Sequence, residues 1–257
     1  MSQLKLALIP PTALLDYTGE TNYQLALPHL QDKQYIKKYK ELSERGDYVI
    51  LDNGVAEGWD VTPSALTDFG RKIGADELVL SDVIGSSLAT VEVAKHAIQS
   101  YDEATIAGEF TYMAVVQGSN LNEFKWCVQQ YATMHYIRTL GIPRHMLKTC
   151  QEPHARVEFV EWALRHFPHR FRYHFLGMDG DFPYEAWHIF NEFHLSPSVR
   201  GLDTSLPFNY AFAGESISHP REKRHRPSDY FNLPGDMFSD YVLKYNISQL
   251  KKWLHVQ

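Results

Sequence analysis

The chain has 257 residues, of which 44% are hydrophobic and 22% charged, and its net charge at pH 7 is −6. This is the composition of an ordinary globular protein, and the charge excludes a surface coated in positive charge while leaving room for a local basic patch. The first residues, MSQLKLALIPP, hold too short an apolar run for a signal peptide, and no stretch approaches the length of a membrane span. A soluble, cytoplasmic protein is therefore expected.

Short apolar runs rich in β-formers alternate with helical patterns along the chain. Strands are predicted over residues 4–10, 48–54, 77–83, 111–118, 135–141, 172–178 and 199–205. Helices are predicted over 63–74, 86–101, 120–134, 154–167 and 240–254. This alternation indicates a parallel sheet covered on both faces, and it favours a single α/β domain over 1–257, a (β/α)8 barrel. Residues 206–237, rich in Pro, Asn and Gly, are predicted to form a long loop.

Polar residues or glycines stand where most of these strands end. They are Asp52, Asp82, Gln117, Gly141, Gly177 and Asp203. Any one of them could simply begin a turn, since Asp and Gly are common there. In a barrel, however, the carboxyl ends of all strands converge on one rim, where catalytic groups of this fold lie. The repeated position therefore predicts a site.

Three chemistries fit paired carboxylates on such a rim. One carboxylate could act as nucleophile and another as acid/base, as in retaining glycosyl transfer, where about 5 Å separates the two groups. Carboxylates could also bind a divalent metal, but none of the 13 histidines is expected at these strand ends. They could instead accept N–H donors from a base with a guanine-like edge. The two cysteines, Cys127 and Cys150, cannot form a Cys-rich zinc site and are expected to be reduced.

Six short motifs, in order, resemble those of the queuine/archaeosine tRNA-guanine transglycosylases. ILDNGVAEG stands at the family's strand ending in Asp-Ser-Gly-Gly, and VLSDV at its base-recognising Asp. VVQGS matches Val-Gln-Gly, LGIPR replaces Gly-Gly-Leu, and HFLGMDG replaces Leu-Met-Gly-Val-Gly. RGLDTSLP matches the Asp-Cys-Val-Leu-Pro element. The similarity covers about residues 48–214 and is closest to the shorter paralogues that insert 7-deazaguanines into DNA in bacterial and phage DNA-modification systems.

The resemblance implies a (β/α)8 barrel and a role for each matching residue. Asp203 would be the nucleophile that attacks C1′ of the target nucleotide, and Asp52 the general acid/base. Asp82 and Gln117 would bind the base edge, assisted by the Gly141 backbone. The implied reaction exchanges guanine in DNA for a free 7-deazaguanine such as preQ0, without a cofactor. Proteins of a modification system would be further partners.

The chain departs from the family at two places. The Cys3His zinc site of the tRNA enzymes cannot be built from two cysteines, and the chain is much shorter than those enzymes. The aromatic residue that stacks on the base in the family is replaced near Ala56, so Phe208 or Tyr210 is a candidate for stacking. These departures favour DNA over tRNA as the substrate.

A basic segment, SHPREKRHRP, supplies the expected contact to phosphates. It contains Arg221, Lys223, Arg224 and Arg226 with Glu222 as its single acid. A solvated, charged loop is the alternative interpretation. Arg144 in GIPRH, on the predicted rim, is a further candidate for phosphate binding. Because a paired base cannot reach such a rim, the target guanine should be flipped out or single-stranded.

Other functions stay open at this point. A barrel of the same kind could act on tRNA, which assays with labelled guanine would distinguish. A non-catalytic nucleic-acid-binding subunit could keep the fold, although it would have no need of both Asp52 and Asp203. A metal-dependent barrel hydrolase is a third alternative, which metal analysis would address.

Overall fold

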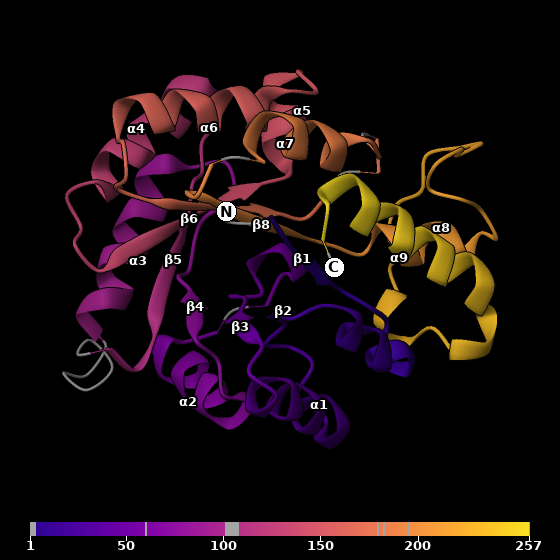
Figure 1. Cartoon of the computed structure of the whole chain (residues 1–257). Helices are drawn as coiled ribbons and strands as arrows, with labels where there is room; N and C mark the ends of the chain where they lie inside the picture. Colours follow the sequence, from indigo (N-terminus) through magenta and orange to yellow (C-terminus); the bar gives the residue numbers. More distant parts are fainter. Residues whose placement is uncertain are drawn as a thin grey trace.

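A computed structural model describes residues 4–59, 61–100, 108–178, 180–181, 183–194 and 196–256. Its centre is an eight-stranded, all-parallel sheet in the order β1-β8-β7-β6-β5-β4-β3-β2 (Figure 1). The strands are β1 Lys5–Leu8, β2 Tyr23–Ala26, β3 Tyr48–Leu51, β4 Glu77–Val79, β5 Thr111–Val115, β6 Ile137–Pro143, β7 Arg172–Leu176 and β8 Val199–Thr204. The two end strands, β1 and β2, approach each other, so the sheet curls into a nearly closed barrel.

Helices follow most strands and surround the barrel (Figure 1). They are α1 Lys33–Glu44, α2 Pro63–Ile73, α3 Ser87–Ser100, α4 Leu121–Tyr131, α5 His145–Cys150, α6 Ala155–His166, α7 Glu185–Phe193, α8 Leu206–Phe212 and α9 Asp240–Leu254. Short 3-10 segments at Thr12–Glu20, Val55–Glu57, Tyr230–Asn232 and Gly235–Met237 complete the described elements. The chain is thus a (β/α)8 barrel of the TIM type.

The prediction of the fold is confirmed, with corrections to individual elements, and the helices α1, α5 and α7 were not predicted. The seven predicted strands all occur, but β2 was missed because it is only four residues long and follows a 3-10 segment rather than a helix. The segment 206–237 is not a continuous loop, because α8 begins directly after β8. Pro207 occupies the first turn of α8, where its missing N–H is not needed.

Local sequence explains where several helices begin and end. The Asp32 side chain accepts hydrogen bonds from the N–H groups of Gln34 and Tyr35 and so caps α1. Thr62 caps α2, and that helix ends at Gly74, whose φ of 68° is accessible to glycine at little cost. These caps fix the helices against the strands that carry the site.

Apolar side chains fill the middle of the barrel and separate its two ends. They come from five strands and the residues that follow them: Ala7, Ile9, Tyr23, Leu25, Leu27, Ile50, Val79, Met113 and Val115. A larger core lies between the sheet and the helices. Because the lumen is packed rather than open, the two mouths of the barrel are separate surfaces.

A buried ion pair braces the carboxyl ends of β6 and β7. The Arg156 guanidinium is fully buried and its Nε donates to Glu185 Oε1 at 2.8 Å. Its other nitrogens donate to the carbonyls of Ile142, Leu176 and Gly177 at 2.9, 2.9 and 2.7 Å. Such a fully satisfied guanidinium holds the two strand ends in one geometry. The rim described next is built on these ends.

Candidate active site

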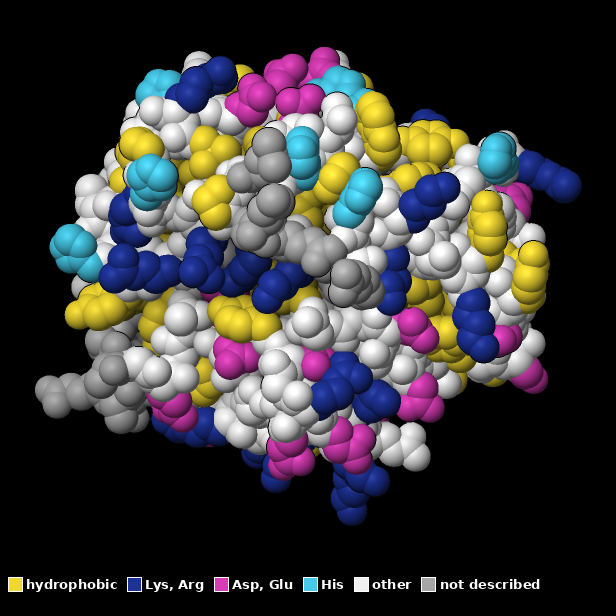
Figure 2. All heavy atoms as spheres, viewed as in Figure 1, with side chains coloured by type: hydrophobic (Ala, Val, Ile, Leu, Met, Phe, Trp, Pro, Cys, Tyr) yellow, Lys and Arg dark blue, Asp and Glu magenta, His cyan; other side chains and the backbone are white. Residues whose placement is uncertain are grey.

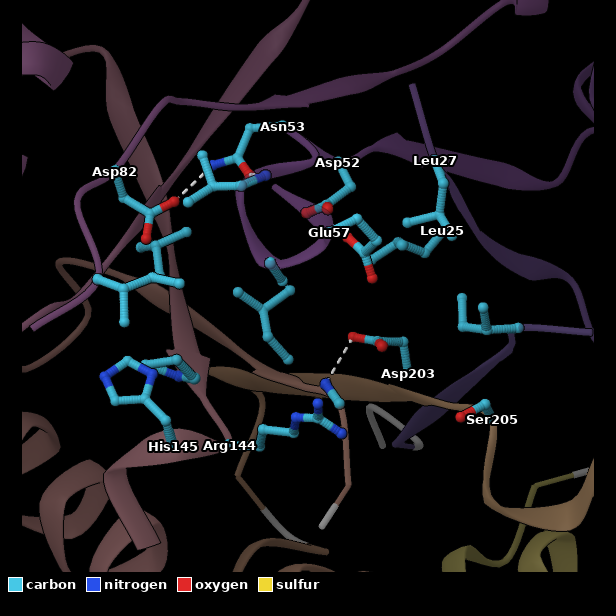
Figure 3. A pocket seen from close by; sticks show the side chains of 18 of the residues that line it. Leu25, Leu27, Asp52, Asn53, Glu57, Asp82, Arg144, His145, Asp203 and Ser205 are labelled. Atoms are coloured by element: carbon cyan, nitrogen blue, oxygen red, sulfur yellow. Dashed lines mark hydrogen bonds between the residues drawn. The ribbon is translucent and has the colours of Figure 1, made fainter. Parts of the chain in front are cut away.

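The carboxyl ends of the strands surround a pocket of about 250 Å³ (Figure 3). Its lining includes Asp52, Asp82, Gln117 and Asp203, which therefore converge as the sequence predicts. All four are nearly buried, with exposed fractions between 2% and 9%. Figure 3 shows Asp52, Glu57 and Asp203 close together, with Asp82 and Asn53 to one side.

Asp203 is held at the end of β8 by two donors. His174 Nε2 lies 2.9 Å from its Oδ1, and the N–H of Gly177 donates to the same oxygen at 3.1 Å. Gly177 has a φ of 63°, and a side chain there would lie 3.3 Å from Arg144 Cδ. Among the described residues, no hydrogen bond reaches Oδ2, so this oxygen is available to a ligand in the pocket.

His174 and Tyr23 form a buried chain beneath Asp203. Burial lowers the pKa of His174, although the Asp203 carboxylate opposes this effect. The ring is therefore neutral at pH 7. Since a carboxylate only accepts, Nε2 carries the proton, and Nδ1 accepts from the Tyr23 hydroxyl at 2.7 Å. The histidine is thus fixed in one tautomer and orients one oxygen of Asp203.

Asp52 follows β3 and is as deeply buried as Asp203, each residue being 8% exposed. Its Oδ2 accepts a 3.1 Å hydrogen bond from the N–H of Gly54, which has a left-handed φ of 77°. Burial raises the pKa of Asp52 to about 8, with a further rise from the nearby Glu57 carboxylate. Asp203 and Asp82 add smaller effects in the same direction. At neutral pH Asp52 therefore carries a proton, as a general acid must.

Asp82 and Gln117 form a polar pair at the ends of β4 and β5. Gln117 Nε2 donates to Asp82 Oδ2, and Asn53 Nδ2 donates to Asp82 Oδ1 at 2.7 Å. Gln117 Oε1 in turn accepts from the N–H of Gly85 at 3.2 Å. Burial raises the pKa of Asp82, while the two amide donors partly offset the rise. Both amides thereby donate to the carboxylate, which lines the pocket.

Gly141 does not line the pocket. β6 continues to Pro143, two residues beyond the predicted end, and the Gly141 carbonyl accepts from the N–H of Val116 at 3.0 Å. Pro143 and Arg144 line the pocket in its place. A side chain at Gly141 would lie 2.6 Å from Leu176, so the glycine is needed for packing inside the barrel.

Five polar residues of the site were not predicted from the sequence, one of them being Ser205 at the rim of the pocket. Asn53, Glu57 and His145 line the pocket, and His174 lies below it. The expectation of no histidine at the strand ends is wrong, because His145 begins α5 two residues after β6. A polar side chain such as His174, between the buried Tyr173 and Phe175 of β7, is a usable signal for an inward-facing group. No sequence signal pointed to Glu57, since its place at the pocket depends on the conformation of the turn after Asp52.

The basic segment has more acidic partners than its sequence suggests. Arg224 pairs with Glu215 and Glu222, Lys223 with Asp181, and Arg226 with Glu57, at 2.7, 3.2, 3.1 and 2.7 Å. Three of its four cations therefore pair with acids. Two of these acids, Glu57 and Asp181, lie outside residues 206–237. Arg226 reaches the pocket itself, as does Arg144.

Neither aromatic residue considered for stacking reaches the pocket. Phe208 and Tyr210 belong to α8 and are completely buried in the core. Ala56 lines the pocket, and apolar walls come from Leu27, Val115 and Met178. Stacking on a bound base would therefore be aliphatic.

No cluster of His, Cys, Asp and Glu side chains suited to a metal occurs among the described residues. Cys127 lies buried in α4 and Cys150 ends α5, and both are free thiols. Nor does the described part of the chain contain a helix both long and apolar enough to cross a bilayer. No protein-family model matches this sequence, and no curated protein shows significant similarity to it.

Proposed function

We propose that the protein is a DNA-guanine transglycosylase that exchanges guanine for a 7-deazaguanine base of the preQ0 type. The observation that carries this proposal is the placement of Asp52 and Asp203 on one pocket, with the Asp82–Gln117 pair beside them. Both residues are 8% exposed, but Asp203 accepts from two donors and Asp52 from one, and burial raises the pKa of Asp52 to about 8. Such a difference divides acid/base and nucleophilic roles between two like residues.

The first half of the exchange forms a covalent intermediate. The unbonded Oδ2 of Asp203 attacks C1′ of the target nucleotide as the bond from C1′ to N9 of guanine breaks. The departing base takes the bonding electrons, and the Asp52 carboxyl group supplies the proton that neutralises it. A pKa of about 8 means that Asp52 holds this proton at neutral pH.

The second half reverses the first with a different base. A 7-deazaguanine occupies the vacated pocket, and the Asp52 carboxylate removes the proton from its N9. N9 then attacks C1′, and the ester to Asp203 breaks with return of its electrons to the carboxylate. Two displacements retain the configuration at C1′, and no cofactor is consumed.

Asp82 and Gln117 would recognise the base edge. Guanine and 7-deazaguanines present two neighbouring N–H donors, which a carboxylate accepts well. Asn53 and Gln117 fix Asp82 by hydrogen bonds, so it does not need to reorient when the base binds. The apolar walls described above would cover the faces of the base.

A groove beside the pocket suits the nucleotide backbone. Its lining includes Arg144, Lys148, Arg226 and the half-exposed Trp59. Arg144 and Arg226 line both the groove and the pocket, so a phosphate in the groove would lie next to a base in the pocket. Cations beside an exposed aromatic ring are typical of single-strand binding, in agreement with a flipped or unpaired guanine.

Trapping the covalent intermediate tests the proposal. Labelled guanine is offered to DNA or tRNA with the wild type, Asp203→Asn, Asp52→Asn and the exposed control Asp68→Asn. We expect Asp203→Asn to abolish both exchange and the adduct on a denaturing gel, because an amide cannot form the glycosyl ester. Asp52→Asn should slow exchange by about 100- to 10,000-fold and leave some adduct.

The outcomes separate the alternatives. Exchange by Asp203→Asn would disprove the assigned mechanism, and exchange into tRNA but not DNA would change the substrate. Binding of nucleic acid without exchange by the wild type would indicate a non-catalytic subunit. Asp68→Asn should behave as the wild type throughout.

A further inference from the structure

The opposite, amino-terminal mouth of the barrel carries a row of cations. Four strands that are neighbours in the sheet, β6, β7, β8 and β1, each have one at their first or second residue. These cations are Arg138, Arg172, Arg200 and Lys5, named here the cationic arc. Neighbouring strands lie about 4.8 Å apart, so the arc places positive charges in close succession. Figure 2 shows a row of Lys and Arg side chains crossing the face on which the N-terminus lies in Figure 1.

Two β-bulges help to build the arc. Tyr112 pairs with Ile137 and Met113 with Thr139, which leaves Arg138 as the extra residue of β6. In the same way, the pairing of β7 with β8 skips one residue, and that residue is Arg200. A bulge redirects a side chain that strict alternation would point elsewhere. Both arginines of the arc that lie at second positions are thus brought to the mouth by the same device.

Three of the four cations of the arc line a cavity of about 420 Å³ that has no acidic lining residue among those described. Its wall contains Arg138, Arg170, Arg172 and Arg200, together with the hydroxyl-bearing residues Tyr48, Thr111, Thr139 and Ser198. Guanidinium groups and hydroxyls are the donors that proteins use for phosphate oxygens. The chemistry of the wall therefore selects an anion.

Only part of this positive charge is used by the fold. Arg200 is paired with the buried Glu77, and Arg170 donates to backbone carbonyls at the end of α4, among them Met134 at 2.7 Å. Lys5, Arg138 and Arg172 are at least partly exposed, and no ion pair joins any of them to a described residue. Lys5 also lies 5.7 Å from the centroid of the Tyr23 ring, a cation–π contact, whereas Arg138 and Arg172 have no evident structural role; all three cations are accessible to a ligand.

We propose that the cationic arc is a second nucleic-acid contact, which binds backbone phosphates at the mouth opposite the active site. An extended row of cations over four strands suits a chain of phosphates better than one small anion. The choice of DNA as the source of these phosphates rests on the proposed function, whereas phosphate binding itself does not.

The fold sets the length of DNA that can use both contacts. Strands of three to seven residues rise about 3.3 Å per residue, so the mouths lie roughly 20 Å apart along the longest strand. A strand that passes outside a helix layer about 10 Å thick must cover roughly 40 Å. An extended single strand covers up to about twice the 3.4 Å per nucleotide of a duplex strand, so that distance needs at least about 6 nucleotides. An oligonucleotide of about 4 nucleotides therefore reaches one mouth only, and one of about 30 reaches both.

Fluorescence anisotropy with labelled single strands of these two lengths tests the proposal. The variant combines Lys5→Gln, Arg138→Gln and Arg172→Gln and leaves the structurally engaged Arg170 and Arg200 in place. Its control combines Lys37→Gln, Lys40→Gln and Arg165→Gln, three exposed helical cations with the same total charge. Thermal unfolding checks that both variants are folded.

We expect the variant to bind the long strand at least 10-fold more weakly than the control does. Its log-log salt slope should be shallower by about 2, since three phosphate contacts are lost at roughly 0.7 each. Exchange on the short strand should equal that of the control. Unchanged affinity for the long strand would overturn the proposal. The proposal would also be overturned if millimolar pyrophosphate competed with DNA at this mouth and the length of the DNA had no effect on its affinity. The arc would then be a site for a small anion. Binding is measured without exchange, so a failure of the proposed reaction would be seen separately.

Discussion

The two mouths of this barrel are built from the same strands but differ in both charge and burial. β8 shows the contrast within six residues, since it has Arg200 near its start and Asp203 near its end. At the carboxyl mouth, Asp52, Asp82 and Asp203 are almost fully buried and bonded to neighbouring groups. At the amino mouth, Arg138 and Arg172 are exposed and have no described ion-pair partner.

Because of this difference in burial, one mouth should carry the proton chemistry and the other should attract phosphates. Desolvation changes the proton affinity of a carboxyl group, so the carboxyl mouth should respond to pH. Exposed cations keep their charge and attract phosphates through a field that salt screens, so the amino mouth should respond to ionic strength. The following predictions test this separation, beginning with the largest expected effect.

His174 should matter for reaction and little for DNA affinity. Replacing it with Phe removes the N–H that orients Asp203, and we expect exchange to fall about 10- to 100-fold through kcat, with KM little changed. His174→Gln retains a donor and should recover part of the loss. Single-turnover exchange with saturating DNA measures this effect.

Tyr173 offers the matched control for His174. It is the preceding residue of β7, and its buried hydroxyl has no hydrogen-bond partner among the described residues. Tyr173→Phe should therefore leave exchange unchanged. Equal losses in Tyr173→Phe and His174→Phe would mean that β7 tolerates no change, and that His174 has no positioning role.

Asp52 should make the protein less stable as the pH rises. An unfolded Asp loses its proton near pH 4, whereas the pKa of folded Asp52 is about 8. Between these values the folded chain binds one more proton, so its free energy of unfolding falls with increasing pH. Asp52→Asn removes this dependence and should raise stability at pH 8 by about 1 to 3 kcal/mol.

Urea unfolding at pH 5 and pH 8 measures this effect. The exposed control Asp68→Asn should follow the wild type at both values. If the free energy of unfolding changed equally with pH in the wild type and in Asp52→Asn, the Asp52 carboxyl group would not be desolvated. The contrast in burial between the two mouths would then be weaker.

The basic segment should make the smallest difference. Neutralising all four of its cations should make the salt slope of DNA binding shallower by about 1. This change is smaller than the one expected on neutralising the cationic arc, because three of the four cations already pair with acids. The residues to be changed are Arg221, Lys223, Arg224 and Arg226. The same anisotropy assay reports the slope, and an unchanged value would place the phosphate contacts elsewhere.

The sequence alone determined the class of fold and the main polar groups of the pocket. Alternating strands and helices indicate a parallel barrel, and residues at the carboxyl ends of its strands must meet at one rim. The sequence therefore places Asp52, Asp82, Gln117 and Asp203 together. These conclusions depend on the order of strands and helices along the chain, which local sequence patterns indicate.

Only the tertiary structure decided how neighbouring strands pair and which side chains meet. Alternation would put Arg200 and Asp203, three residues apart, on opposite faces of β8, but a bulge turns both into the barrel. The contact of His174 with Asp203 and that of Arg226 with Glu57 join segments far apart in sequence. Register and long-range contacts arise from packing between elements, and a pattern within one element does not contain them.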